Sequence, residues 1–362
     1  MANPVLLAIH LDGDGAHPAA WRHVTHTPAE LLSGRRVQTI VTQAEVAGFG
    51  IITFAGGHLP AGEAPNITAR LDPVQQAAFA GPITSRVGLV PTIPATFVEP
   101  FHTANQLASL DHVTRGRGGW IITATGTPTE ARAYSQQPIT DEAALRQEAR
   151  DVLTANRLLW DSWEDDAVIR DTATWRYVDR EKLHYADFTG ATFSVKGPNY
   201  VPRPPQGQLV VFGHDGLLDP TEVEVTIVHG TNIAAIIAAA ASARERGATR
   251  VIADLEVILD SRGVPAAERL ATLDASTVWA AGDDPRIVGP ADDLIAAIRE
   301  LAAHVDGIRL IPAVIDTDLP ELQFAVLRPL IREGIIAAPQ TGATLRETLG
   351  LPHPANRFAT AS

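Results

Sequence analysis

The chain has 362 residues, of which 45% are hydrophobic and 20% charged, so it can bury a large core as one barrel or as two smaller domains. Its formal net charge of −13 opposes contact with a phosphate backbone or an anionic lipid surface, so neither nucleic acid nor a membrane is an expected partner. The absence of cysteine excludes disulfides, thiolate metal sites and cysteine nucleophiles.

Apolar runs alternate with longer amphipathic stretches, which is typical of repeated strand–helix units around a parallel sheet. Strands are predicted, in chain order, at 5–10, 50–55, 87–92, 120–125, 209–213, 223–229, 250–258 and 307–312. Helices are predicted between them, at 31–47, 73–81, 100–112, 141–163, 232–247, 266–272, 290–305 and 319–333. Eight strands with interleaved helices predict an α/β fold, a closed TIM-type (β/α)8 barrel that forms a single domain over residues 1–362.

The alternation is interrupted once, between the fourth and fifth predicted strands. Residues 164–205 mix aromatic side chains with Asp, Thr and Gly, which predicts an insertion with hairpin character, and the four prolines of 197–207 predict a rigid extended strap. The tail, 340–362, has few apolar residues and is predicted to wrap the surface. No basic leader and no run of about 18 apolar residues occurs, so a soluble cytoplasmic protein is expected.

Barrels of this kind place their chemistry on the loops that follow the C-terminal ends of the strands. Histidines end the first and sixth predicted strands and follow the second and fifth, and a carboxylate lies in the seventh. The candidate catalytic residues are therefore His10, His58, His214, His229 and Glu256. Convergent imidazole and carboxylate groups suit general acid–base work. No pair of histidines has HxH or HxxxH spacing, so no metal site is predicted.

Two of these observations have a second interpretation. Glu256 is equally explained as an interior carboxylate paired with an arginine such as Arg250 or Arg309. The glycine-rich stretches 115–119 and 212–216 suit a phosphate cradle, because glycine lets backbone N–H groups approach an anion, and Gly213 is a candidate on that ground. Neither stretch matches GxGxxG or a P-loop, and the first is equally explained as a tight turn before the fourth strand.

Short motifs in a fixed order along nearly the whole chain resemble the bacterial-luciferase-like flavin monooxygenases. They are similar to the branch of the nitrilotriacetate and dibenzothiophene-sulfone monooxygenases (component A). The matching segments are 17–23 (HPAAWRH), 99–102 (EPFH), 110–112 (LDH), 116–120 (GRGGW), 159–167 (LWDSWEDDA), 197–198, 204–207 (PPQG), 288–290 and 344–352 (TLRETLGLP).

The resemblance implies a barrel that binds FMN, supplied in reduced form by a separate flavin reductase. Such a barrel uses O2 to oxygenate a small organic substrate through a flavin C4a-peroxide. It also implies a homodimer that pairs through helices near the second and third strand–helix units. The expected partners are therefore a small organic substrate, a flavin reductase or a competent homologous subunit, and a second copy of the chain.

The positions that hold flavin in the family carry different residues here. Gly56 stands where the family usually has an aspartate, and a threonine of the third-strand loop, Thr92 or Thr96, is retained. Other contact positions of the family fall on Glu142, Arg146, Leu217 and Ile121. Arg146, turned inward, offsets the charge of Asp215 near the expected phosphate. The cofactor-binding candidates are Gly56, Thr92, Thr96, Arg146 and Gly213.

Three functions follow from these positions. The first is an FMN-dependent monooxygenase with an atypical flavin site. The second is a non-catalytic or partner-subunit homologue that has lost FMN binding. The third is a barrel enzyme with repurposed histidine and carboxylate chemistry.

Overall fold

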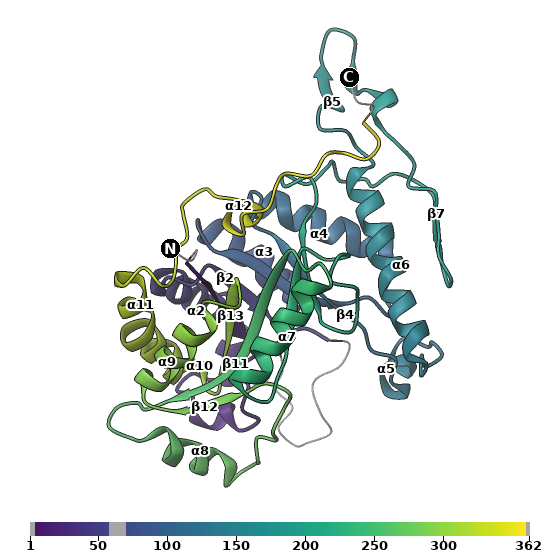
Figure 1. The fold of residues 1–362 in the computed structure, drawn as a ribbon. Coiled ribbons are helices and arrows are strands. Elements are labelled where there is room, and N and C mark those ends of the chain that lie inside the picture. The colour runs from purple at the N-terminus through teal and green to yellow at the C-terminus, as the bar shows by residue number, and fades with distance from the viewer. Residues whose placement is uncertain (1–3, 58–69, 360–362) are drawn as a thin grey trace.

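Eight parallel strands close into a barrel in the computed structural model, which describes residues 4–57 and 70–359 (Figure 1). They are β1 (Leu6–Leu11), β2 (Ile51–Phe54), β3 (Gly88–Pro94), β4 (Gly119–Thr123), β9 (Val210–His214), β10 (Val225–Val228), β11 (Arg250–Leu259) and β13 (Gly307–Pro312). The ring closes because β1 pairs with β13 and β10 pairs with β11. The predicted barrel and its eight strands are confirmed. A further parallel strand, β12 (Arg286–Gly289), extends the outer end of β11 and was not predicted.

Helices surround this ring as the sequence predicted. They are α1 (Pro28–Leu31), α2 (Gly34–Ala47), α3 (Pro73–Ala80), α4 (Pro100–Thr114), α5 (Pro128–Ala133), α6 (Glu142–Asp161), α7 (Ile233–Glu245), α8 (Ala266–Asp274), α9 (Ala291–Leu301), α10 (Ile315–Glu321), α11 (Arg328–Arg332) and α12 (Leu345–Thr348). A π-helical stretch, Leu322–Leu327, joins α10 to α11. Short 3-10 turns lie at Ala20–His23, Gly81–Ile83 and Arg180–Lys182. In the part of the chain that the structure describes, no helix is both long and apolar enough to cross a bilayer.

Several helices begin at a side chain that accepts a hydrogen bond from their first turn. The capping residues are Ser33 of α2, Asp72 of α3, Asp141 of α6 and Asn232 of α7. Each satisfies one of the backbone N–H groups that have no partner within the helix. These four capping side chains therefore set where α2, α3, α6 and α7 begin.

The strands are apolar on both faces, as expected for a parallel sheet covered by helices. One face packs against the helices, and the other fills the barrel with Ile51, Val90, Ile121, Phe212 and Ile252 among others. Because side chains alternate along a strand, the inward face continues in steps of two residues toward the C-terminal ends. At those ends the inward-facing residues become polar, and this end of the barrel is called the mouth below.

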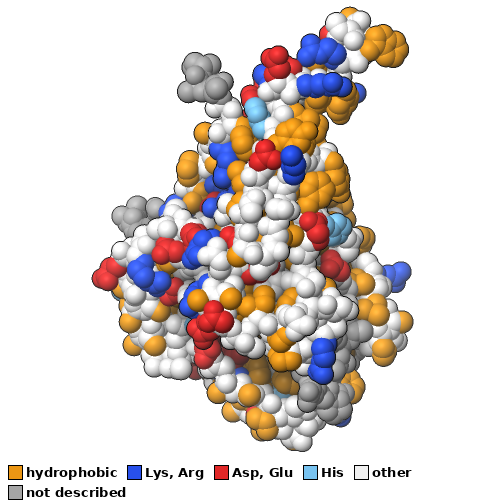
Figure 2. All heavy atoms as spheres, turned by 90° about the vertical axis from the view of Figure 1, so that its right-hand side faces the viewer, with side chains coloured by type: hydrophobic (Ala, Val, Ile, Leu, Met, Phe, Trp, Pro, Cys, Tyr) orange, Lys and Arg blue, Asp and Glu red, His pale blue; other side chains and the backbone are white. Residues whose placement is uncertain are grey.

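The insertion between β4 and β9 has the predicted hairpin character. β5 (Val168–Asp171) pairs antiparallel with β6 (Arg176–Val178), and β7 (Phe188–Thr189) pairs antiparallel with β8 (Ser194–Val195). Hydrophobic side chains gather over this projecting insertion (Figure 2). Trp175, between β5 and β6, is 94% exposed. An exposed aromatic arm of this kind suits an interface between protein chains, and the expected homodimer stays a prediction.

Several motifs that carry the family resemblance form a buried hydrogen-bond network around Asp111, at the end of the barrel opposite the mouth. The carboxylate of Asp111 accepts hydrogen bonds from Nε2 of Gln206 (2.6 Å), from the backbone N–H of Gln206 (3.1 Å) and from that of Gly118 (3.2 Å). Arg115 and Gly116 adopt positive φ angles of 56° and 81°. The stretch 115–119 is therefore a tight turn, and the backbone N–H groups of Gly116 and Gly118 donate to Asp111. Its interpretation as a phosphate cradle is wrong.

We expect acid to strengthen the fold through Asp111. Burial raises the pKa of Asp111 to about 6, and its hydrogen bonds offset only part of that effect. A carboxyl whose pKa is higher in the folded than in the unfolded state stabilises the fold below its unfolded pKa, and this stability is lost as pH rises through 6. Between pH 7 and pH 5 the free energy of unfolding should gain about 1 kcal/mol from this group.

Urea unfolding of the wild type and of Asp111→Asn at pH 5, 6 and 7 measures that gain. The difference between the two proteins should change with pH, because the amide does not titrate. Asp283→Asn, at an exposed carboxyl on the other end of the molecule, is the matched control. A wild type and an Asp111→Asn variant with parallel pH dependence contradict the prediction.

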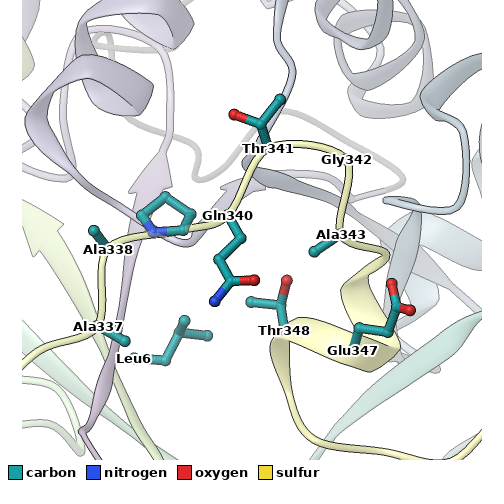
Figure 3. Close-up of a pocket in the computed structure, with 10 residues that line it drawn as sticks. Leu6, Ala337, Ala338, Gln340, Thr341, Gly342, Ala343, Glu347 and Thr348 are labelled. Atoms are coloured by element: carbon teal, nitrogen blue, oxygen red, sulfur yellow. The ribbon is translucent and has the colours of Figure 1, made fainter.

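The C-terminal tail does more than wrap the surface, so that part of the prediction is wrong. Leu345, Leu349 and Leu351 are buried and belong to the apolar cluster inside the barrel. Leu349 and Leu351 follow Leu345 by four and six residues, and the three side chains close the N-terminal end of the ring. They are called the plug below. A pocket of about 460 Å³ lies beside the plug and is lined by Leu6, residues 337–343, Glu347 and Thr348 (Figure 3). It is at the opposite end from the mouth.

Candidate functional site at the mouth of the barrel

The mouth begins where β1 and β2 present polar side chains on the inward face. His10 and Thr53 lie side by side, with Nδ1 of His10 2.9 Å from Oγ1 of Thr53. The Thr53 hydroxyl donates to the carbonyl of Ile9 (3.4 Å), so its oxygen is left to accept from Nδ1–H of His10. This assignment leaves the lone pair of Nε2 on His10 facing the mouth.

Two further histidines stack across β9 and the end of β10. The rings of His214 and His229 lie 5.0 Å apart at an interplanar angle of 14°, and Nδ1 of His214 is 2.8 Å from Nε2 of His229. Nδ1 of His229 lies 2.7 Å from a carboxylate oxygen of Asp284, in the loop before β12. Asp284, His229 and His214 therefore form one hydrogen-bonded line that ends at the mouth.

Below that line a buried ion pair crosses from β11 to β13. Nε of Arg309 donates to Oδ1 of Asp254 (2.8 Å), and Nη2 donates to the other oxygen. The two residues are directly opposite in the strand register. Arg309 therefore pairs with Asp254, and its predicted pairing with Glu256 is wrong.

Glu256 pairs with an arginine of the unpredicted strand. Nε of Arg286 donates to Glu256 (2.7 Å), and the Arg286 guanidinium lies 3.8 Å over the ring of Trp279. Arg250, the other suggested partner, donates to the carbonyls of Leu349 and Gly350 at the far end of the barrel. Glu256 is thus held at the edge of the mouth, with Asp284 as a charged neighbour.

Burial and the Arg309 guanidinium set the protonation of the mouth. They lower the pKa of His10 to about 3 and that of His214 to about 4. The hydrogen bond that His229 donates to Asp284 raises the pKa of His229 against the effect of burial. At neutral pH His10 and His214 are therefore neutral acceptors, and a proton entering the cluster is best held on His229.

Three ligand atoms of the mouth are close enough together to share a metal ion. One atom each from His229, Asp254 and Asp284 lie within 4.8 Å of one another. Arg309 already occupies both oxygens of Asp254, and His229 occupies Asp284. The two carboxylates thus have cationic or N–H partners from the protein itself. The expectation of no metal site stays a prediction.

The structure brings three of the five candidate catalytic residues together: His10, His214 and His229. Glu256 lies beside them but is committed to Arg286. His58 lies outside the described residues. Asp254 and Asp284 were not among the candidates from the sequence, and Arg309 was named only as a possible partner of Glu256. Asp254 lies two residues before Glu256 on the same face of β11, so the period of two was a usable signal, whereas Asp284 lies in a loop and had none.

The cofactor-binding candidates are scattered. Thr92 follows Val90 on the inward face of β3 and lies at the mouth. The hydroxyl of Thr96 donates to the carbonyl of Thr125 (2.7 Å) and accepts from its N–H (3.2 Å), so it holds one loop to another.

Arg146 on α6 pairs with Glu142 (3.2 Å), one turn earlier on the same helix. Gly213 lies on the outer face of β9, where a Cβ would meet Val223 at 3.1 Å. Of the two threonines, the structure leaves Thr92 as the one that faces the mouth.

Gly56 is glycine because the chain leaves no room for a side chain. A Cβ at this position would lie 2.0 Å from the carbonyl oxygen of Thr92 and 2.9 Å from Pro73. The aspartate of the family therefore does not fit this backbone without a shift of β3 or of the segment after β2.

We expect Gly56→Ala to lower the free energy of unfolding by about 1–3 kcal/mol, the usual cost of overpacking a filled space. Gly197→Ala is the matched control, because a Cβ there meets nothing within 4 Å. Urea unfolding of both variants beside the wild type measures the difference. Equal unfolding midpoints for the two variants contradict the close approach at Gly56.

Comparison with known proteins identifies the family of the chain. The pattern of the family described as luciferase-like monooxygenase matches residues 16–274. The match covers more than half of the chain and runs from the loop after β1 to α8. The chain belongs to the luciferase-like monooxygenase family, whose members are flavin-dependent oxidoreductases.

Two curated relatives and two solved structures illustrate the similarity. The N-acetyl-S-(2-succino)cysteine monooxygenase of Bacillus subtilis is 26% identical over 433 aligned positions, which cover 98% of each chain. The dibenzothiophene-sulfone monooxygenase of Rhodococcus erythropolis is 32% identical over 203 positions, 53% of this chain and 45% of that protein.

A riboflavin lyase superposes with a TM-score of 0.84 at 21% identity, over 97% of both chains. A long-chain alkane monooxygenase superposes with a TM-score of 0.83 at 18% identity, over 97% of this chain and 96% of that one. These two structural likenesses confirm the fold, whereas the family match and the curated relatives confirm the branch that the sequence motifs predicted.

Proposed function

We propose that the protein is a two-component monooxygenase that acts on a small organic molecule at the mouth of the barrel, with reduced FMN supplied by a separate flavin reductase. Membership of the flavin-dependent family supports the reaction class. The observation on which the proposal depends is the cluster of His10, His214 and His229, because it lies at the end where barrels carry their chemistry and contains two rings that are neutral at pH 7.

An atypical flavin site is supported by the residues at the positions where the family resemblance implies flavin contacts. Gly56 has no room for the aspartate, Ile121 is buried inside the barrel, and Glu142 and Arg146 pair with each other. Four missing hydrogen bonds at about 1 kcal/mol each weaken binding roughly a thousandfold. We therefore propose that this protein holds FMN transiently, with Thr92 as the retained contact.

Titration with FMN, and with reduced FMN under anaerobic conditions, tests the proposal. We expect the protein to quench flavin fluorescence at high micromolar FMN and to elute from gel filtration without it. Thr92→Val should weaken the quench several-fold, and Gly197→Ala, which touches no mouth residue, should leave it unchanged. No quench up to millimolar FMN in either redox state contradicts the proposal.

A second candidate is a partner subunit that no longer binds flavin, and it is favoured by the crowded approach at Gly56. The same titration separates the two candidates, since a non-binding subunit shows no quench at any concentration. Pull-down with a competent homologue then tests the partnership directly.

A further inference from the structure

The hydrogen-bonded line of the mouth has only one consistent order of donors when its rings are neutral. The Asp284 carboxylate only accepts, so Nδ1 of His229 carries a proton. Nε2 of the neutral His229 ring is then an acceptor, so Nδ1 of His214 carries the proton between the two rings. Nε2 of His214 is left with a lone pair.

That last nitrogen has no partner among the residues that the structure describes. His214 is half-buried at the C-terminal end of β9, across the mouth from His10 on β1. His17, a buried histidine outside the mouth, contrasts with it: Nδ1 accepts from the N–H of Ala19 (3.0 Å), and Nε2–H donates to Asp274 (3.0 Å). A structural histidine here uses both nitrogens, and His214 does not.

We propose that Asp284, His229 and His214 form a proton relay whose outer end, Nε2 of His214, exchanges a proton with a weakly acidic O–H or activated C–H group of a small molecule at the mouth. His214 is the catalytic residue of this relay, and His229 and Asp284 are positioning residues. The relay acts on the protein's own groups, so it goes beyond the proposed flavin-dependent reaction and does not depend on it.

The transfer conserves every proton and electron pair. The lone pair of Nε2 on His214 takes the proton of the ligand, and the bonding electrons stay on the ligand as an anion. The proton on Nδ1 of His214 then passes to Nε2 of His229. The positive charge ends on His229, in direct contact with the Asp284 carboxylate, and the reverse sequence returns a proton to the ligand.

Charged groups on every neighbouring element act on this balance. Arg309 on β13 disfavours a second positive charge, and Asp254 on β11 favours one. His10 on β1 is neutral, because burial and Arg309 lower its pKa to about 3. Glu256 faces Asp284 from the outer end of β11. These charges place the proton at the inner end of the relay and leave its outer end neutral.

Nuclear magnetic resonance of the full chain labelled with 15N-histidine, without flavin, tests the relay. Above its protonation step, His214 and His229 should both carry the proton on Nδ1, whereas His17 carries it on Nε2. Acidification should shift the nitrogens of His214 and His229 at one common midpoint. Asp284→Asn should lower that midpoint by about 1–3 pH units, the usual effect of losing a paired carboxylate.

Asp274→Asn is the matched control, because it removes the carboxylate partner of His17 and should leave the common midpoint unchanged. Acylation by diethyl pyrocarbonate at pH 7, read by mass spectrometry, should mark His214 and spare His17. A proton on Nε2 of neutral His214 overturns the relay. Separate titration midpoints for His214 and His229 that Asp284→Asn leaves unchanged also overturn it. A stoichiometric divalent ion whose removal shifts the nitrogen resonances of both His214 and His229 also overturns it.

None of these measurements involves flavin, so a failed FMN titration leaves the relay standing. If Asp284→Asn does not fold, the wild-type spectrum still tests the relay through the Nδ1 protons and the common midpoint of His214 and His229.

Discussion

Asp254→Asn is expected to lower the free energy of unfolding by about 3–5 kcal/mol, because it leaves the guanidinium of Arg309 buried without its carboxylate. Both side chains are nearly inaccessible to water, and both oxygens of Asp254 are occupied by the guanidinium. The cost comes mainly from the uncompensated charge and less from the lost contact, since a buried pair repays little more than the desolvation of its members.

Urea unfolding of Asp254→Asn, Arg309→Met and the double variant separates these contributions. The double variant should be more stable than Asp254→Asn, because no charge remains unpaired. Arg299→Ala removes an exposed ion pair with Glu333 and should cost no more than about 1 kcal/mol. If Asp254→Asn lowers the free energy of unfolding as little as Arg299→Ala does, the Asp254–Arg309 pair is not needed to stabilise the inward face of the mouth.

The barrel was readable from the sequence because buried parallel strands leave a plain signal. β2, β9 and β10 are buried on both faces, so each appears as a short, nearly continuous run of hydrophobic residues. β12 left no such signal: its four residues are only half-buried, and it adds to the outer end of β11 outside the ring. The plug was missed because three leucines in a polar tail have no period that distinguishes a buried turn from a surface loop.

The site was half readable for a similar reason. His10, His214 and His229 were found because each falls at the end of a predicted strand, and strand ends converge in a barrel. The partners of Glu256 and Arg309 were mispaired because pairing depends on strand register, in which Asp254 faces Arg309 and Glu256 faces Arg286. A sequence that gives the strands without their offsets cannot fix which charges meet.

Four of the motifs that carry the family resemblance lie at the end of the barrel opposite the mouth. The motifs at 110–112, 116–120 and 204–207 meet around Asp111, and 344–352 supplies the plug. These segments hold the N-terminal end of the barrel together, away from the mouth. A match of this kind therefore supports the fold more strongly than it supports the retention of the flavin contacts.

Leu345→Ala should lower the free energy of unfolding by about 2–5 kcal/mol, because it empties the centre of the plug. The methyl groups of Leu345 fill the space that two strand glycines leave open: a Cβ on Gly88 would lie 2.6 Å from one of them, and a Cβ on Gly119 2.9 Å from the other. Leu32→Ala, at a leucine that is 45% exposed, is the control and should cost far less.

Urea unfolding measures the loss, and the histidine resonances of the mouth measure its reach. Because the plug and the mouth are at opposite ends of a packed ring, Leu345→Ala should leave the midpoint of His214 and His229 unchanged in the folded protein. A cost below about 1 kcal/mol shows that the ring is stable without its plug. A shift of the histidine midpoint shows instead that the stabilising end and the chemical end are coupled through the eight strands between them.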